Sequence, residues 1–406
     1  MTAPAAATPL APAPPPPAAS TWSRMRLWGT AHAVDDLYQG LVPACVPYFV
    51  LDRHYGYVAA AGLTMAATLG SSVPQPFVGV LVDRRGLPRL AAAGVALAGT
   101  ALGLSGLLPS YAAVWTLVLL SGLGVALFHP AAGRSAREAA GDSAGAMSVF
   151  AAGGSVGFFL APVLATPALV AWGVGATALF IPPALLTAYA LLRHQRRAAA
   201  LAGPRAAAPD GSDRWRPFLV LTGVEVVRSV TFFGVNTFIE LYWLRDLHDS
   251  RAVAGTALAC FLGGGVAGTL LGGRIADRIG LVRTVRIGTA LSVPMLVGLR
   301  LAPGSGFPAA AAALLFAALA GVALNIPFAV LVKLGQDYLP TRPGTAAGVT
   351  LGLAVSVGGL FSPLLGLVAD AHGPRAVFTV LCGVPLLGLA LGLGLREPGG
   401  PRAPGS

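Results

Sequence analysis

The chain has 406 residues, of which 55% are hydrophobic and only 11% are charged, and its mean hydropathy is +0.73. Soluble domains carry about 25% charged residues, so this composition excludes an ordinary soluble protein and indicates a bilayer. The net charge of +11 would suit nucleic acid only as a patch on a soluble surface, whereas the basic residues here lie in short segments between apolar runs. We therefore expect lipid and no nucleic acid as a partner.

Between two polar ends, the chain contains twelve apolar runs, each near the roughly 20 residues that a helix needs to cross a membrane. Residues 1–21, rich in Ala and Pro, and residues 397–406 predict disordered tails. The expected spans are 27–50, 57–82, 90–108, 111–132, 144–166, 171–192, 217–243, 253–275, 284–302, 307–332, 345–369 and 376–395. Six belong to an N-terminal bundle (22–193) and six to a C-terminal bundle (216–396), joined by a basic linker (194–215).

The distribution of basic residues predicts the orientation. With both termini in the cytoplasm, most of the 27 lysines and arginines lie in cytoplasmic segments. The outer loops hold Arg53, Arg245, Arg251, Arg300 and Arg375. Cytoplasmic loops of membrane proteins carry such an excess of positive charge. We therefore expect a multi-pass membrane protein with both termini in the cytoplasm.

A charged turn occurs twice, as GVLVDRRGLPR after the second span and as GRIADRIGLVR after the eighth. The matching positions are Gly79, Asp83, Arg84, Gly86 and Arg89 in the first copy and Gly273, Asp277, Arg278, Gly280 and Arg283 in the second. The offset of 194 residues, from Gly79 to Gly273, relates equivalent spans of the two bundles. This pattern is typical of transporters built from two parallel repeats about an axis along the membrane normal.

The repeated turn could join the two bundles at their cytoplasmic ends. Its aspartate could lie against the positive N-terminal end of a helix in the other bundle, Asp83 near Thr345 and, by symmetry, Asp277 near Ser143. The alternative is that the arginines only anchor the topology, which accounts for the charges but not for the recurring glycines and aspartate.

The repeated turn resembles the cytoplasmic signature of the major facilitator superfamily. Three more stretches look like its fosmidomycin-resistance branch: AHAVDDLYQGLVPACVPYF, GLGVALFHPAAGRSAR and GQDYLPTRPGTAAGVTLGLAVSVGGLFSPLLGLVAD. The resemblance covers about residues 25–395. It implies an all-α integral membrane protein with twelve transmembrane helices in two pseudo-symmetric six-helix bundles. It also implies a bacterial inner membrane, a gating role for the repeated turn, and drug export driven by the proton gradient, with no cofactor. We expect a monomer. The chain departs from the branch at Ala131 and Glu240, where an acidic residue and a proline are usual.

Polar residues form a stripe along the first span. His32, Asp35, Asp36 and Gln39 have the spacing of one helical face. Ionisable groups at membrane depth cost about 2.5–3.5 kcal/mol each, so such a face predicts an aqueous cavity that binds substrate or protons. The alternative is that one aspartate caps or pairs structurally near the inner end.

The seventh span carries a second polar set, consisting of Glu225, Arg228, Ser229 and Asn236. The repeat offset places Asp35 at the height of Ser229, and the two helices that open the bundles face each other in parallel-repeat transporters. We therefore predict that Asp35 or Asp36 comes within ion-pair reach of Arg228 in at least one state. Alternatively, Glu225 neutralises Arg228 within its own helix.

Two prolines lie near the inner ends of spans four and ten. His129 precedes Pro130, and Asn325 lies two residues before Pro327, so these segments could be discontinuous and line the cavity, or simply be kinked for packing. Gln336 and Asp337 are expected in solvent just outside the tenth span.

No metal site or enzyme centre is expected. Cys45, Cys260 and Cys382 are isolated in apolar runs, and no paired spacing of Cys and His occurs. His32 and His129 are expected on separate spans without neighbouring ligands. An intramembrane enzyme is therefore a remote alternative.

These features together predict a secondary active transporter that works by alternating access. The leading hypothesis is proton-coupled efflux of a small organic compound or drug, with phosphonate-like anions as candidates. An anion that binds Arg228 would remove the counter-charge of the paired aspartate, which would then take up a proton. The alternative is a proton-coupled importer of a carboxylate or a phosphorylated metabolite.

Overall fold

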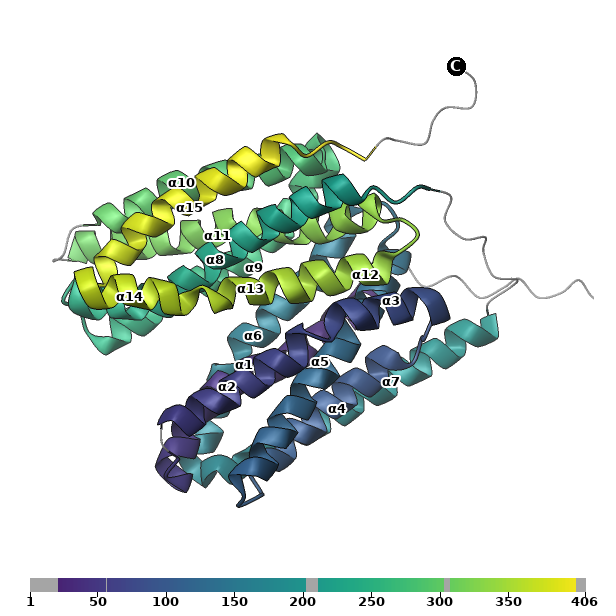
Figure 1. The fold of residues 1–406 in the computed structure, drawn as a ribbon, viewed down its shortest axis with the longest axis horizontal. Helices are drawn as coiled ribbons and strands as arrows, with labels where there is room; N and C mark the ends of the chain where they lie inside the picture. The colour runs from purple at the N-terminus through teal and green to yellow at the C-terminus, as the bar shows by residue number, and fades with distance from the viewer. Residues whose placement is uncertain (1–20, 56, 202–210, 303–306, 399–406) are drawn as a thin grey trace, which may run out of the picture.

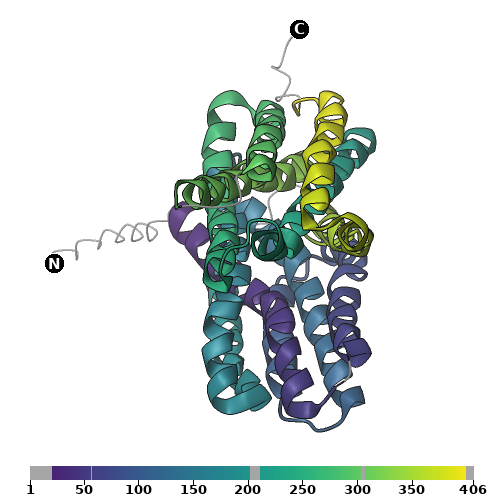
Figure 2. The same cartoon turned by 90° about the vertical axis from the view of Figure 1, so that its left-hand side faces the viewer.

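The computed structural model describes residues 21–55, 57–201, 211–302 and 307–398. Within these ranges the chain is helical, and no strand occurs. Most of the two expected tails and residues 202–210 of the expected linker lie outside the described residues. Figure 1 shows the helices as two bundles, with the N-terminal half below the C-terminal half, and Figure 2 shows the same division after a 90° turn.

The helices of the N-terminal half are α1 (Thr21–Arg53), α2 (Tyr57–Ser72), α3 (Gln75–Arg85), α4 (Leu90–Ser105), α5 (Tyr111–Ala140), α6 (Ala144–Trp172), a 3₁₀ segment η1 (Gly173–Phe180) and α7 (Ile181–Leu201). The helices of the C-terminal half are α8 (Trp215–Arg245), α9 (Arg251–Ile279), α10 (Leu281–Leu301), α11 (Phe307–Tyr338), α12 (Pro343–Ala347), a π-helical turn η2 (Gly348–Leu353), α13 (Ala354–Leu360), α14 (Ser362–His372) and α15 (Pro374–Leu393).

Nine helical segments of the described residues are long and apolar enough to cross a membrane. One of them, Ala144–Arg197, has 54 residues and contains both α6 and α7. The shorter α4 and the polar α1 are not among the nine. With α2 and α3 taken as one pass and α12 to α14 as another, the element order is consistent with the predicted twelve spans.

Several helices differ from the expected spans. The second pass is broken between Ser72 and Gln75 at Pro74, because proline cannot donate a backbone hydrogen bond. Helices α5 and α11 continue past the expected ends to Ala140 and Tyr338. Hydropathy falls where charged residues begin, but a helix continues as long as its backbone bonds are satisfied and its side chains are packed.

Small residues allow helices within a half to pack closely. Gly264, Gly268 and Gly272 on α9 each face backbone atoms of α11, where any larger side chain would overlap. Without a hydrophobic driving force between helices in lipid, such close backbone approach is a main source of helix association. Each half therefore packs around its own buried core, with Phe128 and Phe150 in the first and Trp243 and Phe378 in the second.

Candidate functional site

The first copy of the repeated turn contacts the opposite half. The Asp83 carboxylate, at the end of α3, accepts hydrogen bonds of 2.7 Å from the backbone N–H of Gly344 and from the N–H and hydroxyl of Thr345. Gly344 and Thr345 lie at the start of α12. The predicted contact between Asp83 and the start of span eleven is therefore present.

The second copy repeats this chemistry in the other direction. Asp277, on α9, accepts hydrogen bonds of 2.6 and 2.8 Å from the N–H groups of Ala144 and Gly145 at the start of α6. The Ser143 hydroxyl donates a third bond of 3.1 Å to the same carboxylate. The symmetric contact near Ser143 is thus present as well, and each aspartate meets the positive end of a helix in the opposite half.

The first glycine of each turn explains why the motif recurs as a unit. A Cβ atom at Gly79 would lie 2.6 Å from the carbonyl oxygen of Gly344 and 2.7 Å from the Cα of Thr345. A Cβ atom at Gly273 would lie 2.5 Å from the carbonyl oxygen of Ala144. Both glycines therefore permit the close approach that brings the aspartate, four residues later, to the opposite half.

The rest of the turn has a different role. Gly86 and Gly280 have φ of 57° and 95°, a region that favours glycine, and they end α3 and α9. The four motif arginines are exposed, namely Arg84, Arg89, Arg278 and Arg283. Exposure fits topology anchoring for the arginines, whereas the aspartates and leading glycines form the contact between the halves.

A third connection between the halves was missed from the sequence. Asp337 on α11 accepts hydrogen bonds of 2.6 Å from Arg137 on α5 and from Lys333 one turn earlier. Gln336 is buried and donates a 3.0 Å hydrogen bond to the Gly133 carbonyl of α5. The expectation that Gln336 and Asp337 are solvated is wrong, because α11 extends to Tyr338 and packs its last turn against the other half.

On α1, the polar stripe divides between two environments. Asp35 is fully buried, and within the described residues neither of its carboxylate oxygens has a hydrogen-bond partner. Asp36 keeps 18% of its side chain exposed, and Gln39 is half-buried. A helix turns about 100° per residue, so neighbouring aspartates point in different directions. The expectation of a single cavity-lining face is therefore wrong for Asp35.

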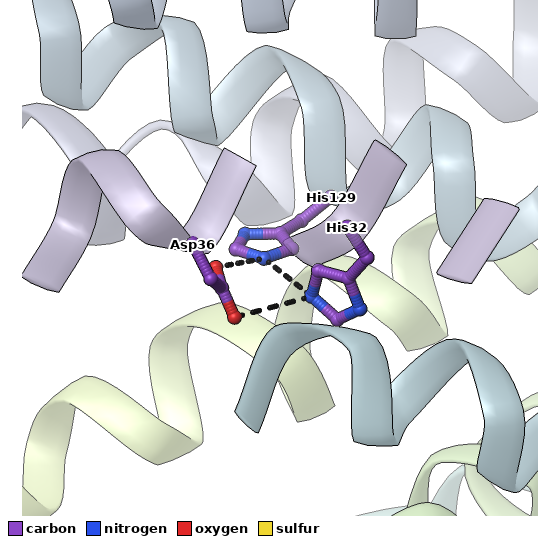
Figure 3. Close-up of side chains that lie close together, drawn as sticks. All are labelled: His32, Asp36 and His129. Atoms are coloured by element: carbon purple, nitrogen blue, oxygen red, sulfur yellow. Dashed lines mark hydrogen bonds and ion pairs between the residues drawn. The ribbon is translucent and has the colours of Figure 1, made fainter. Parts of the chain in front are cut away.

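His32 and Asp36 of α1 meet His129 of α5 (Figure 3). The two Nε2 atoms lie 3.1 Å apart, and Asp36 oxygens lie 3.1 Å from His129 Nε2 and 3.3 Å from His32 Nε2. Both histidines are almost completely buried. The expectation that these histidines lack neighbouring ligands is wrong, because α1 and α5 bring together residues 97 positions apart.

The first helix of the C-terminal half carries a buried ion pair. The Arg228 guanidinium donates to both oxygens of Glu225, at 2.5 and 2.9 Å, and Asn325 of α11 lies 3.5 Å away. The Arg228 charge also lies 4.6 Å from the centre of the Phe328 ring, a cation–π distance. Glu225 is fully buried and Arg228 is 9% exposed. The alternative partner of Arg228, Glu225, is therefore the one present in this structure.

The remaining candidates are placed as follows. The Ser229 hydroxyl donates to the Val355 carbonyl on α13, and Asn236 is half-buried on α8. Pro130 and Pro327 lie inside α5 and α11, which continue through them. Of the two alternatives, the discontinuous segments are therefore wrong, and proline within a continuous helix is what the structure has. The pairing of Asp35 or Asp36 with Arg228 is not found in this conformation and stays a prediction for another state.

Comparison with known proteins places this architecture in a family. The chain is 30% identical over 388 residues to an uncharacterized MFS-type transporter, YfnC, of Bacillus subtilis, covering 92% of this chain and 93% of that one. It is 29% identical over 371 residues to the fosmidomycin resistance protein of Escherichia coli, covering 88% and 89%. A bacterial homologue of the iron transporter ferroportin, solved in an outward-facing state, superposes with a TM-score of 0.73 over 91% and 98% of the two chains.

The identity to the ferroportin homologue is 16%, so that likeness shows the fold alone. The sequence profile of the superfamily matches residues 30–224 and 221–406, one match for each half. Members of this superfamily are transporters, which excludes the alternative of an intramembrane enzyme. The chain belongs to the Major Facilitator Superfamily.

Proposed function

We propose that the chain couples the proton gradient to the efflux of a small organic anion by alternating access. The observation that carries this proposal is the buried ion pair of Glu225 and Arg228 on α8. Ionisable groups at membrane depth mark substrate and proton pathways, since their insertion is costly. The similarity to a protein named for fosmidomycin resistance supports efflux, with phosphonates as the substrate class.

The Glu225–Arg228 pair provides a way to link the transport of protons to the transport of substrate. An anionic substrate that binds the Arg228 guanidinium competes with Glu225 for the same donors. A buried carboxylate that loses its counter-charge is costly, so a bound anion and a proton on Glu225 favour each other. A proton carried together with the substrate would drive import, so efflux requires that the two are carried in turn. Glu225 then stays ionised while the substrate is bound, takes up a proton on the outer side after the substrate has left, and releases that proton to the cytoplasm. The sequence-based hypothesis used an aspartate of α1 in place of Glu225.

The contacts between the halves define the state of the gate. The bonds of Asp83 and Asp277 join the halves at the end of the bundle that carries the repeated turns. The positive-inside rule predicts that this end lies in the cytoplasm, together with both termini. The similarity to bacterial transporters supports a bacterial inner membrane. The described conformation is then closed to the cytoplasm, and opening requires both aspartates to leave the helix ends.

Everted membrane vesicles with an imposed proton gradient test this function, with fosmidomycin as the transported probe. Efflux in the cell corresponds to proton-driven uptake into everted vesicles, which we expect for the natural chain and not for Glu225→Gln. Glu240→Gln, an exposed acid farther along α8, is the matched control and should keep full uptake. Proton-driven depletion of the probe would establish the importer instead. Uptake by Glu225→Gln at the natural rate would remove Glu225 from the coupling step.

A further inference from the structure

We propose that His32, Asp36 and His129 bind one divalent transition-metal ion, such as Zn²⁺. The three side chains come from two helices of the N-terminal half, and their donor atoms converge on one point (Figure 3). This site lies apart from the Glu225–Arg228 pair of the C-terminal half, so the inference goes beyond the proposed function and does not rest on it.

The spacing of the donors fits a metal ion. The two imidazole Nε2 atoms and the two nearest carboxylate oxygens are separated by 3.1, 3.1 and 3.3 Å. A tetrahedral ion with bonds of about 2.0–2.1 Å separates its ligand atoms by about 3.3 Å, and an octahedral ion with similar bonds by about 3.0 Å. The observed distances lie between these two geometries, but His129 and His32 face different oxygens of Asp36. An ion can therefore bind through both carboxylate oxygens, or through one after the carboxylate turns.

The hydrogen bonds also favour a cation in this place. His32 Nδ1 lies 2.8 Å from the Phe150 carbonyl oxygen, which can only accept, so Nδ1 carries the hydrogen and Nε2 of the neutral ring presents a lone pair. That lone pair faces Asp36 at 3.3 Å and His129 Nε2 at 3.1 Å. A hydrogen on His129 Nε2 can bridge one of its two contacts, but the contact between the His32 lone pair and Asp36 still joins two acceptors, and a cation would relieve it. A histidine fixed through its other nitrogen by a backbone carbonyl is the usual arrangement of a metal ligand.

The surroundings hold the donors in position. A Cβ atom at Gly154 of α6 would lie 2.7 Å from His32 Nε2 and would overlap Asp36, so the glycine lets these donor atoms pack directly against the α6 backbone. The His32 ring stacks on Phe150 with ring centres 4.3 Å apart, which holds its orientation. Asp36 keeps 18% of its side chain exposed, which gives a route from solvent.

The donor set selects the class of ion. Two imidazoles and one carboxylate suit Zn²⁺, Ni²⁺, Co²⁺ or Fe²⁺, whereas Mg²⁺ and Ca²⁺ prefer oxygen ligands only. Three protein ligands leave an open coordination position, which a water molecule or another small ligand can fill. The inference therefore predicts an exchangeable site rather than a closed structural one.

Co²⁺ titration of the purified full chain in detergent micelles tests the site, because bound Co²⁺ has visible absorption bands that report nitrogen ligands. The affinity tag must contain no histidine. We expect one Co²⁺ per chain, displaced by an equimolar amount of Zn²⁺. The affinity for Co²⁺ should fall at least tenfold in His129→Gln and in Asp36→Asn.

Two controls separate this site from other effects. His372→Gln removes a histidine outside the cluster and should bind Co²⁺ as the natural chain does. Gly154→Ala leaves all three ligands in the chain, but its methyl group would overlap Asp36 and displace it, so it should weaken binding while size-exclusion elution stays unchanged. Binding that survives in the double variant His32→Gln/His129→Gln, or no Co²⁺ bands in the natural chain, would overturn the inference whatever the transport assay shows.

Discussion

Asp83 and Thr345 lie 262 positions apart in the chain and are joined by two hydrogen bonds of 2.7 Å. Asp277 makes the equivalent contact with Ser143, Ala144 and Gly145 in the opposite direction. The duplicated turn therefore forms two equivalent hydrogen-bonded contacts between the halves, one at the start of α12 and one at the start of α6. A gate closed by two such contacts should open more readily when either is weakened.

Asp83→Asn and Asp277→Asn should each favour opening at the end that carries the turns. The amide keeps an acceptor but loses the charge, which weakens charge-assisted bonds to the helix end by about 1–2 kcal/mol, or roughly five- to thirtyfold in the opening equilibrium. A single cysteine at position 72 reports the change, because Ser72 is buried beside Ser356 of the other half. Its labelling by an impermeant maleimide from that side should rise in both variants.

Asp370→Asn is the matched control for this experiment. Asp370 is an exposed carboxylate on α14, whereas Asp83 meets the same pass at its other end, at the start of α12, so the same chemical change should leave labelling at position 72 unchanged. Equal labelling in Asp83→Asn, Asp370→Asn and the natural chain would show that the aspartate contacts do not hold the gate.

Gly79→Ala should destabilise the closed conformation because its methyl group needs space, and no charge changes. The added Cβ would lie 2.6 Å from a backbone oxygen of α12 and 2.7 Å from a backbone carbon, and neither atom can move without shifting the helix. Gly366→Ala, where nothing lies within 4 Å, makes the same chemical change without a clash. Cysteine labelling at position 72 should therefore rise in Gly79→Ala alone. A Gly79→Ala chain that labels like Gly366→Ala would show that the closed halves tolerate the extra methyl group.

The contacts of Asp83 and Asp277 with the opposite half could be predicted from the sequence, whereas the cluster of His32 and His129 could not. The repeat fixes which turn belongs to which half, and the helix dipole then attracts an aspartate to a helix start. The cluster depends on how α1 and α5 are rotated against each other, which hydropathy does not encode. Asp337 was misplaced for a related reason, since the apolar run ends at Lys333 but the helix continues to Tyr338.

Glu225→Gln should destabilise the protein by about 3–5 kcal/mol, because it leaves the Arg228 charge buried without its carboxylate partner. The double variant Glu225→Gln/Arg228→Met removes the uncompensated charge and should recover most of the loss. Thermal unfolding of the four chains in detergent gives the coupling energy as a double-mutant cycle. Additive losses in the double variant would show that the two side chains do not stabilise each other.

Asp337→Asn should destabilise the closed gate more strongly than Asp83→Asn. Asp337 is the shared partner of Arg137 from the other half and of Lys333, whose side chain is 6% exposed, so one substitution weakens two ion pairs. Labelling at position 72 should rise in Asp337→Asn. Adding Lys333→Met should restore thermal stability, because no buried ammonium group is then left unpaired. Labelling should stay high in this double variant, because Arg137 still lacks its partner across the interface. This separation follows from the geometry: Lys333 lies on the same helix as Asp337, whereas Arg137 joins the halves. If Lys333→Met returned labelling at position 72 to its natural level, the Lys333–Asp337 pair within α11 would be the one that controls closure.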